Sequence, residues 1–303
     1  MSDPIISAAG LNMAFGQVQA LNNVDLQVPA GRIGLVGANG AGKSTLIKIL
    51  LGMLRPSSGA TQVFGTSAQQ QPLAVRSRVG YMPEGDCFPP DQSAADFVSY
   101  AAELGGLPPT ESRQRASEVL TLVGLAEERF RNLGEFSTGM KQRAKLAQAI
   151  VHSPELVLLD EPASGLDPDG REDMLNLINR LGTFGMSVVF SSHVLGDIER
   201  TCDWVVMLNE GRLLRNEPLA TIRASNAVQV VVLGDPEPAA AALRSRGART
   251  TVKERAIDVE VDDGDPFVLI RDVLAETGTG LRSLGAKETT LEDVYLAEEE
   301  FTG

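Results

Sequence analysis

The segment Gly37–Thr45 carries the clearest chemical pattern of this chain, because it reads GANGAGKST and fits G-x-x-x-x-G-K-[ST]. Its glycines permit a tight turn whose backbone N–H groups can approach an anionic oxygen without a Cβ in the way. Lys43 can place a positive charge on outer phosphates, and the Ser44 hydroxyl can ligate Mg²⁺. We therefore expect a nucleotide site built from Gly37, Asn39, Gly40, Ala41, Gly42, Lys43, Ser44 and Thr45.

The residues on either side of this loop have the secondary-structure pattern that such a site requires. An apolar run over 33–36 precedes the loop, and the run TLIKILLG follows it, which predicts the order strand, glycine loop, helix. The positive N-terminal end of that helix would face the phosphates. This context disfavours an ordinary glycine-rich turn that binds nothing.

Two carboxylates, Asp160 and Glu161, directly follow the apolar run over 156–159. An all-apolar strand is typical of a parallel sheet covered by helices, and ligands of such sheets bind at the carboxyl ends of the strands. We predict that Asp160 holds Mg²⁺ and that Glu161 orients and deprotonates an attacking water. The alternative for Asp160 is a simple helix cap.

Each of three further side chains could contact the nucleotide or could have only a structural role. His193 follows the buried strand expected over 186–190, and we expect it to contact the terminal phosphate. His152, at the end of an amphipathic helix, is interpreted as structural. Phe15 precedes Gly16, and an aromatic residue considered in isolation is more often part of the core than a ligand contact.

The bulk composition describes a globular protein, with 303 residues, 43% hydrophobic and 22% charged. A net charge of −13 argues against binding to nucleic acid or to anionic lipid by charge alone. Cys87 and Cys202 are far apart and form no disulfide or zinc pattern. No apolar run is long enough to span a bilayer and no signal segment is recognisable, so we expect a cytoplasmic protein.

The remaining elements are predicted from periodicity and turn residues. Residues 5–36 alternate short strands with turns, residues 91–133 are helical, and another helix is expected over Met140–Val151. Beyond about Arg223, strands over 228–233, 256–261 and 281–284 and helices over 237–246 and 265–277 predict a small βαββαβ sheet with helices on one face.

The segment Phe136–Met140, reading FSTGM before KQR, resembles the signature sequence, usually LSGGQ, of the ATP-binding subunits of ABC transporters. Ser137 and Gly139 keep the second and fourth positions, while Phe, Thr and Met replace Leu, Gly and Gln. Variants that read STGMKQR are familiar among drug-exporter-type members. The resemblance spans about residues 5–218.

The resemblance assigns roles to single residues. It implies that Phe15 stacks on adenine, that Asp160 is the Walker B aspartate, that Glu161 is the catalytic glutamate and that His193 is the switch histidine. Glu84 stands where the family usually has Gln; its carboxylate can still ligate Mg²⁺ but adds negative charge near ATP. The D-loop would comprise Ser164, Gly165, Leu166 and Asp167.

The resemblance also implies an α/β phosphate-loop NTPase fold with a mostly parallel core sheet and an N-terminal antiparallel β part. Residues 1–222 would form the ATPase domain, and an inserted helical subdomain, about residues 85–150, would grip a membrane permease. Residues 223–303 would form a small α+β domain that supports dimerisation or regulation, or that only caps the core. The stretch 289–296 resembles the family's closing helix, and 298–300 is expected to be a solvated acidic terminus.

The function implied is ATP hydrolysis, with Mg²⁺, that powers export through a separate permease. Two ATPase subunits, expected to be identical chains, would pair head to tail, and the protein would touch the membrane only through the permease, at its cytoplasmic face. The signature residues of one subunit would then reach the phosphate loop of the other, and here they are Ser137, Thr138, Gly139 and Met140.

Other functions remain as alternatives. A soluble ABC ATPase that remodels a ribosome usually has two ATPase domains and a basic linker, whereas this chain has one set of motifs and is acidic. A DNA-repair ATPase would need a long heptad-bearing insertion between Gly42 and Ser137. A phosphate-loop kinase or GTPase would lack the signature segment. No pattern in the sequence encodes a transported substrate.

Overall fold

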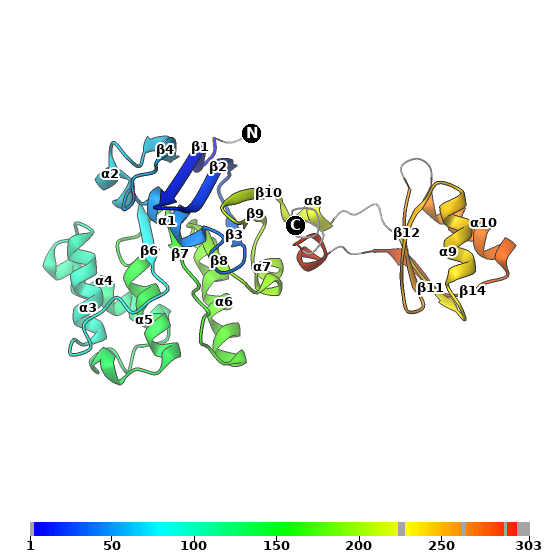
Figure 1. The fold of residues 1–303 in the computed structure, drawn as a ribbon. Coiled ribbons are helices and arrows are strands. Elements are labelled where there is room, and N and C mark those ends of the chain that lie inside the picture. The colour runs from blue at the N-terminus through cyan, green and yellow to red at the C-terminus, as the bar shows by residue number, and fades with distance from the viewer. Residues whose placement is uncertain (1–2, 224–227, 262–264, 288–289, 296–303) are drawn as a thin grey trace. The chain divides into compact units, whose positions relative to one another are not determined.

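The computed structural model describes residues 3–223, 228–261, 265–287 and 290–295. The chain divides into two compact units, Met1–Leu219 and Ala220–Gly303, and each is described by itself. Figure 1 shows the order of the elements along the chain. In the described residues no helix is both long and apolar enough to cross a bilayer.

A six-stranded sheet organises the first unit, in the order β10-β9-β3-β8-β7-β6. All neighbouring pairs are parallel except β9 with β10, which confirms the predicted mostly parallel sheet. Every residue of β7 is buried, as the apolar run predicted. The strands are β3 (Arg32–Val36), β6 (Val79–Met82), β7 (Leu156–Leu159), β8 (Ser187–Ser192), β9 (Trp204–Asn209) and β10 (Arg212–Pro218).

The register of these strands brings their carboxyl ends to one edge of the sheet. Val36 at the end of β3 pairs with Ser192 at the end of β8. Leu159 at the end of β7 pairs with Phe190 of β8 and with Met82 at the end of β6. The loops that follow β3, β6, β7 and β8 therefore leave the sheet side by side, at the edge where α/β folds bind ligands.

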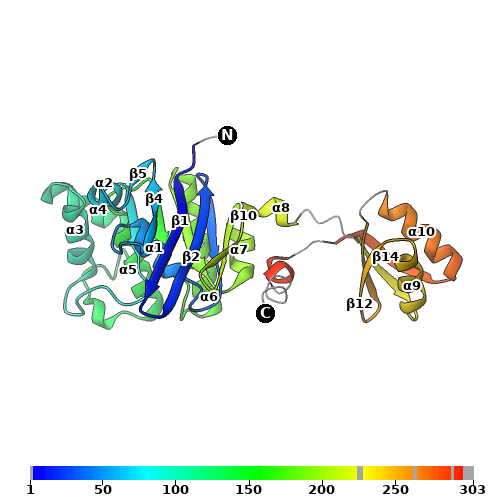
Figure 2. The same ribbon diagram turned by 45° about the horizontal axis from the view of Figure 1, so that its top comes forward.

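The N-terminal residues form an antiparallel sheet of order β2-β1-β4-β5, as predicted. Figure 2 shows β1 and β2 crossing in front of α1 and the parallel strands. Short helix α2 (Pro72–Arg76) follows this sheet. The strands are β1 (Ile6–Phe15), β2 (Val18–Val28), β4 (Ser58–Val63) and β5 (Thr66–Ser67).

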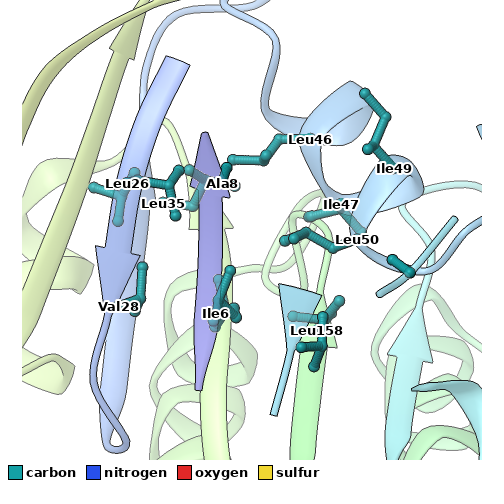
Figure 3. Packing of buried hydrophobic residues seen from close by; sticks show 14 of the residues in the cluster. Ile6, Ala8, Leu26, Val28, Leu35, Leu46, Ile47, Ile49, Leu50 and Leu158 are labelled. Carbon is teal, nitrogen blue, oxygen red and sulfur yellow. The ribbon is translucent and has the colours of Figure 1, made fainter. Parts of the chain in front are cut away.

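Helix α1 (Lys43–Leu50) is held by the core between the two sheets. Its Ile47 and Leu50 lie near Ile6 of β1 and Leu158 of β7 (Figure 3). Each fully buried Leu or Ile contributes about 1.5–3 kcal/mol. Helix α1 follows the phosphate loop, and its burial in the core holds that end of the loop in place. The four buried residues of this kind are Leu46, Ile47, Ile49 and Leu50.

Helices α3 (Ala94–Leu104), α4 (Pro109–Leu122) and α5 (Thr138–Ile150) pack together, and Ser93 caps α3 by accepting a hydrogen bond from the Asp96 N–H. The predicted start of α5 at Met140 was wrong, because Ser137 is the N-cap residue and the helix begins at Thr138. The first unit also contains a 3-10 turn over Leu133–Glu135, α6 (Pro168–Thr183) and α7 (Leu195–Thr201), and α8 covers Leu219–Arg223.

The second unit contains an antiparallel sheet of order β12-β13-β11-β14 with α9 and α10 on one face, as predicted. Alternate β11 residues, Val228, Val230 and Val232, are buried with Ala240 and Ile270 of the helices. Residues 291–295 are helical, and residues 298–300 lie outside the described residues. The elements are β11 (Val228–Leu233), α9 (Glu237–Ser245), β12 (Arg249–Lys253), β13 (Ala256–Glu260), α10 (Pro266–Thr277) and β14 (Gly280–Ala286).

Both cysteines are free thiols, as expected. Cys202 is buried beside β3, and burial raises the pKa of its thiol well above the ordinary value. Cys87 is exposed in the loop after β6.

Candidate functional site

The phosphate loop connects β3 to α1 and bends through glycines that no other residue could replace without strain. Gly40 and Gly42 have φ of 86° and 104°, in the left-handed region. A Cβ on Gly42 would lie 2.6 Å from the Ala20 carbonyl oxygen. Gly42 also occupies the N-cap of α1 without a side-chain cap, so the first N–H groups of the helix are available to an anion.

Lys43 is the first residue of α1, directly after the loop, and it is only 6% exposed. Its Nζ donates hydrogen bonds to the carbonyl oxygens of Gly37, at 2.6 Å, and Ala38, at 3.2 Å. The same Nζ is 3.8 Å from Oε1 of Glu161. The loop therefore presents a desolvated cation next to the predicted general base, which suits a bound polyphosphate.

Glu161 follows β7 in a backbone conformation that is uncommon for a residue with a side chain, with φ of 49°. Its Oε2 lies 3.0 Å from Nδ1 of His193, which extends from the end of β8. Oε1 is buried and makes no hydrogen bond within the described part of the chain. Glu161 thus keeps one oxygen oriented by His193 and one oxygen that can accept a proton from water.

Asp160 is buried and is oriented by Ser191 of β8. The Ser191 hydroxyl donates to Oδ1 of Asp160 at 2.8 Å and accepts the backbone N–H of Glu161, also at 2.8 Å. One hydroxyl therefore positions both carboxylate residues. Sequence patterns assigned no role to Ser191; its position near the end of a buried strand, two residues before His193, is a signal that could have indicated one.

Replacing Ser191 by Ala is expected to lower kcat for ATP hydrolysis about tenfold while ATP affinity stays near the native value. The substitution leaves the buried Glu161 N–H without its acceptor, a loss of about 1–3 kcal/mol. Steady-state ATPase rates and nucleotide titrations measure the two quantities. Ser192→Ala is the matched control, because within the described part of the chain the Ser192 hydroxyl bonds to the Val194 backbone; equal losses in both variants would contradict the assignment.

One cavity of about 280 Å³ joins the phosphate loop to residues from two other loops. Glu84, two residues after β6, and Glu161, after β7, both line it. Ala20 of β2 also lines it, a contact that the sequence did not indicate. Its lining residues are Ala20, Asn39, Gly40, Ala41, Gly42, Lys43, Ser44, Thr45, Glu84 and Glu161.

Phe15 lies at the end of β1, before the turn into β2. Its side chain is 48% exposed, so the alternative that Phe15 belongs to the core is wrong. It does not line the phosphate-loop cavity. An exposed ring at this position remains free to stack on a planar ligand.

The signature residues lie apart from the phosphate-loop cavity of their own chain, since none of them lines it. Ser137 caps α5 by accepting the Met140 N–H at 3.3 Å, and Thr138 and Gly139 form the first turn of the helix. Gln142, one turn further, donates to the Ser164 carbonyl at 3.1 Å. The signature helix and the D-loop of one chain thus form a connected unit.

The predicted D-loop residues lie next to Glu161, the predicted general base. Ser164, Gly165 and Leu166 line a second cavity, of about 210 Å³, together with Glu161 and His193. Asp167 occupies the N-cap position of α6, without a side-chain cap hydrogen bond. His193 itself is 55% exposed and directs its ring to Glu161.

The residues around the phosphate loop fit Mg²⁺ as part of a nucleotide complex. Ser44 and Glu84 offer oxygen ligands in the same cavity, and Asp160 lies directly before Glu161. Within the described ranges no group of three or more His, Cys, Asp or Glu side chains could hold a metal by itself. Mg²⁺ itself takes one or two carboxylates and completes its shell with phosphates and water.

This chain is similar to known proteins over most of its length. The family model described as ABC transporter matches residues 21–164. The bacitracin transport ATP-binding protein BcrA of Bacillus licheniformis is 35% identical, over 73% of this chain and 72% of that protein. The daunorubicin/doxorubicin resistance ATP-binding protein DrrA of Streptomyces peucetius is 29% identical, over 96% of this chain and 91% of that protein.

Among solved structures, an ATP-binding subunit of an ABC transporter superposes with a TM-score of 0.65. It is 30% identical and covers 72% of this chain and 92% of its own. The shared fold, the sequence identity to BcrA and the convergence of phosphate loop, Glu161 and His193 lead to one conclusion. The chain belongs to the ABC transporter family, as one of its ATP-binding and ATP-hydrolysing subunits.

Proposed function

We propose that this chain powers export through a separate membrane permease, bound at the cytoplasmic face of the membrane. The observation that carries the proposal is the separation of the signature residues from the phosphate-loop cavity of the same chain, because a site split in this way needs a second subunit. The relatives named for bacitracin transport and for drug resistance support export of a small molecule. They do not support the ribosomal alternative.

In the proposed hydrolysis, ATP binds with its phosphates on the α1 N-terminus and its outer phosphates at Lys43. Glu161 accepts the proton of the attacking water at Oε1, while His193 holds Oε2. Ser44, Glu84 and Asp160 would hold Mg²⁺, which neutralises phosphate charge when bound. Phe15 would stack on the adenine ring.

Family members of this kind dimerise and work with separate permease components. We infer that two copies of this chain pair head to tail, so that Ser137, Thr138, Gly139 and Met140 of one copy face the γ-phosphate held by the other. The N-terminus of α5 then offers N–H donors and a favourable dipole to the phosphate. ATP would bridge the two subunits, and hydrolysis would loosen the pair.

Affinity purification of the tagged full chain from solubilised membranes is expected to recover a polytopic membrane protein. Helix α3 exposes two large apolar side chains, Tyr100 at 59% and Leu104 at 72%, which suit contact with a protein partner. Mass spectrometry identifies the partner, and an untagged chain serves as the control. Recovery of ribosomes without a membrane protein would overturn the proposed function.

A further inference from the structure

Lys145 of α5 is a buried cation with an unusual set of partners, since its side chain is only 1% exposed. Its Nζ donates to three consecutive carbonyl oxygens, those of Pro83 at 2.8 Å, Glu84 at 2.7 Å and Gly85 at 3.2 Å. These bonds use all three donors of the ammonium group. Burial lowers the pKa of Lys145, so placing this amine in the interior costs free energy and calls for an explanation.

The three carbonyls belong to the loop that carries Glu84. Residues 83–87 form neither helix nor strand, so this backbone receives no support from a strand ladder. Lys141, one turn before Lys145 on the same face of α5, places its Nζ 3.6 Å from Oδ2 of Asp86. Helix α5 therefore contacts this loop through two lysine side chains that lie one helical turn apart.

Helix α5 is itself fixed against the sheet and against the D-loop. A Cβ on Gly80 of β6 would lie 2.0 Å from the Ala149 carbonyl oxygen, so the backbones of β6 and α5 are in close contact. At the other end of the helix, Gln142 bonds to the Ser164 carbonyl and Ser137 caps the first turn. The signature, the D-loop and the Glu84 loop are therefore all attached to one rigid helix.

We propose that Lys145 is a positioning residue that sets Glu84 in the phosphate-loop cavity and links its position to α5. The amine acts on the backbone of the loop, while the Glu84 carboxylate faces the bound nucleotide and its Mg²⁺. Movement of α5 on pairing with a second subunit would then move Glu84 as well. The inference rests on the proposed role of Glu84 as a metal ligand.

The test uses the full chain with Lys145→Met, which keeps the length and apolar stem of the side chain and removes all three donors. Amide hydrogen exchange in residues 80–90 is expected to become about tenfold faster, because three carbonyl oxygens of the loop lose the buried amine that binds them. The Mg²⁺ concentration for half-maximal ATP hydrolysis is expected to rise about tenfold. Binding of ATP in the absence of Mg²⁺ is expected to stay unchanged.

Arg143→Met is the matched control, since it removes a cation from the same helix. The Arg143 guanidinium contacts the Val123 carbonyl and Asp173, away from the Glu84 loop. This variant should leave hydrogen exchange in residues 80–90 and the Mg²⁺ dependence at the native values. If Lys145→Met does not fold, Lys145→Gln keeps an amide donor for the loop and is measured in its place.

The same substitution in a chain that also carries Glu84→Ala distinguishes a role of Lys145 in positioning Glu84 from a role in packing alone. In Glu84→Ala chains, adding Lys145→Met is expected to speed hydrogen exchange as before but to cause no further shift in Mg²⁺ dependence. Equal Mg²⁺ shifts with and without Glu84, or unchanged hydrogen exchange, would overturn the inference. Failure to find a permease would overturn the proposed transport function and would leave both of these measurements unaffected.

Discussion

Glu161→Gln is expected to slow ATP hydrolysis by about 10²- to 10⁴-fold while ATP still binds. The amide keeps the shape of the side chain and its contact with His193, but it cannot accept a proton at the position of Oε1, which is buried and makes no hydrogen bond among the described residues. ATPase assays give the rate, and titration with a fluorescent nucleotide gives the affinity. A chain that binds ATP without hydrolysing it should also accumulate as a dimer in size-exclusion chromatography.

Glu155→Gln is the matched control for this experiment. Glu155 precedes the same strand but is exposed and bonds to Arg78 through both oxygens. Its substitution should leave turnover at the native level. Near-native hydrolysis by Glu161→Gln would remove Glu161 as the base, and loss of ATP binding would mean that the substitution disturbs Lys43 instead.

Lys43→Ala is expected to weaken ATP binding by roughly 10- to 100-fold. Hydrogen bonds to a charged group contribute about 1.5–3 kcal/mol, and about 1.4 kcal/mol corresponds to a tenfold change in affinity. The Lys43 amine is buried within the loop, so water cannot replace it in solvating an outer phosphate. Isothermal titration calorimetry with ATP measures the change.

Lys48→Ala provides the comparison, because Lys48 is an exposed cation in the last turn of the same helix. Its removal changes the net charge equally but leaves the loop intact, and the affinity for ATP should change less than twofold. An equal loss in both variants would show that Lys43 contributes only general electrostatic attraction.

Much of the fold was predictable because its determinants are local. The all-apolar residues of β7 predicted a strand in a parallel sheet, and the valine-rich run over 228–233 predicted strand β11, whose alternate residues are buried. Strand β12 was not placed, because RTTVK is polar on its exposed side and only partly buried on the other. Its pairing with β13 comes from the hairpin geometry.

The start of α5 shows where local patterns were insufficient. Glycine has low helix propensity, so Gly139 favoured a later start at Met140. The N-cap hydrogen bond of Ser137 and the packing of the first turn beside the D-loop outweigh that propensity and place Gly139 inside the helix.

The phosphate loop, Asp160, Glu161, His193 and the signature were all recognisable in the sequence, because each depends on residue types at short spacing. Ser191 and Lys145 were not, since their roles arise from contacts across 30 and 62 positions of the chain. A serine in a strand or a lysine in a helix has many possible partners, and only the packed sheet and helices select one of them. Tertiary structure therefore decided which groups orient Asp160 and Glu161, while residue types at short spacing were enough to predict which residues bind and hydrolyse the nucleotide.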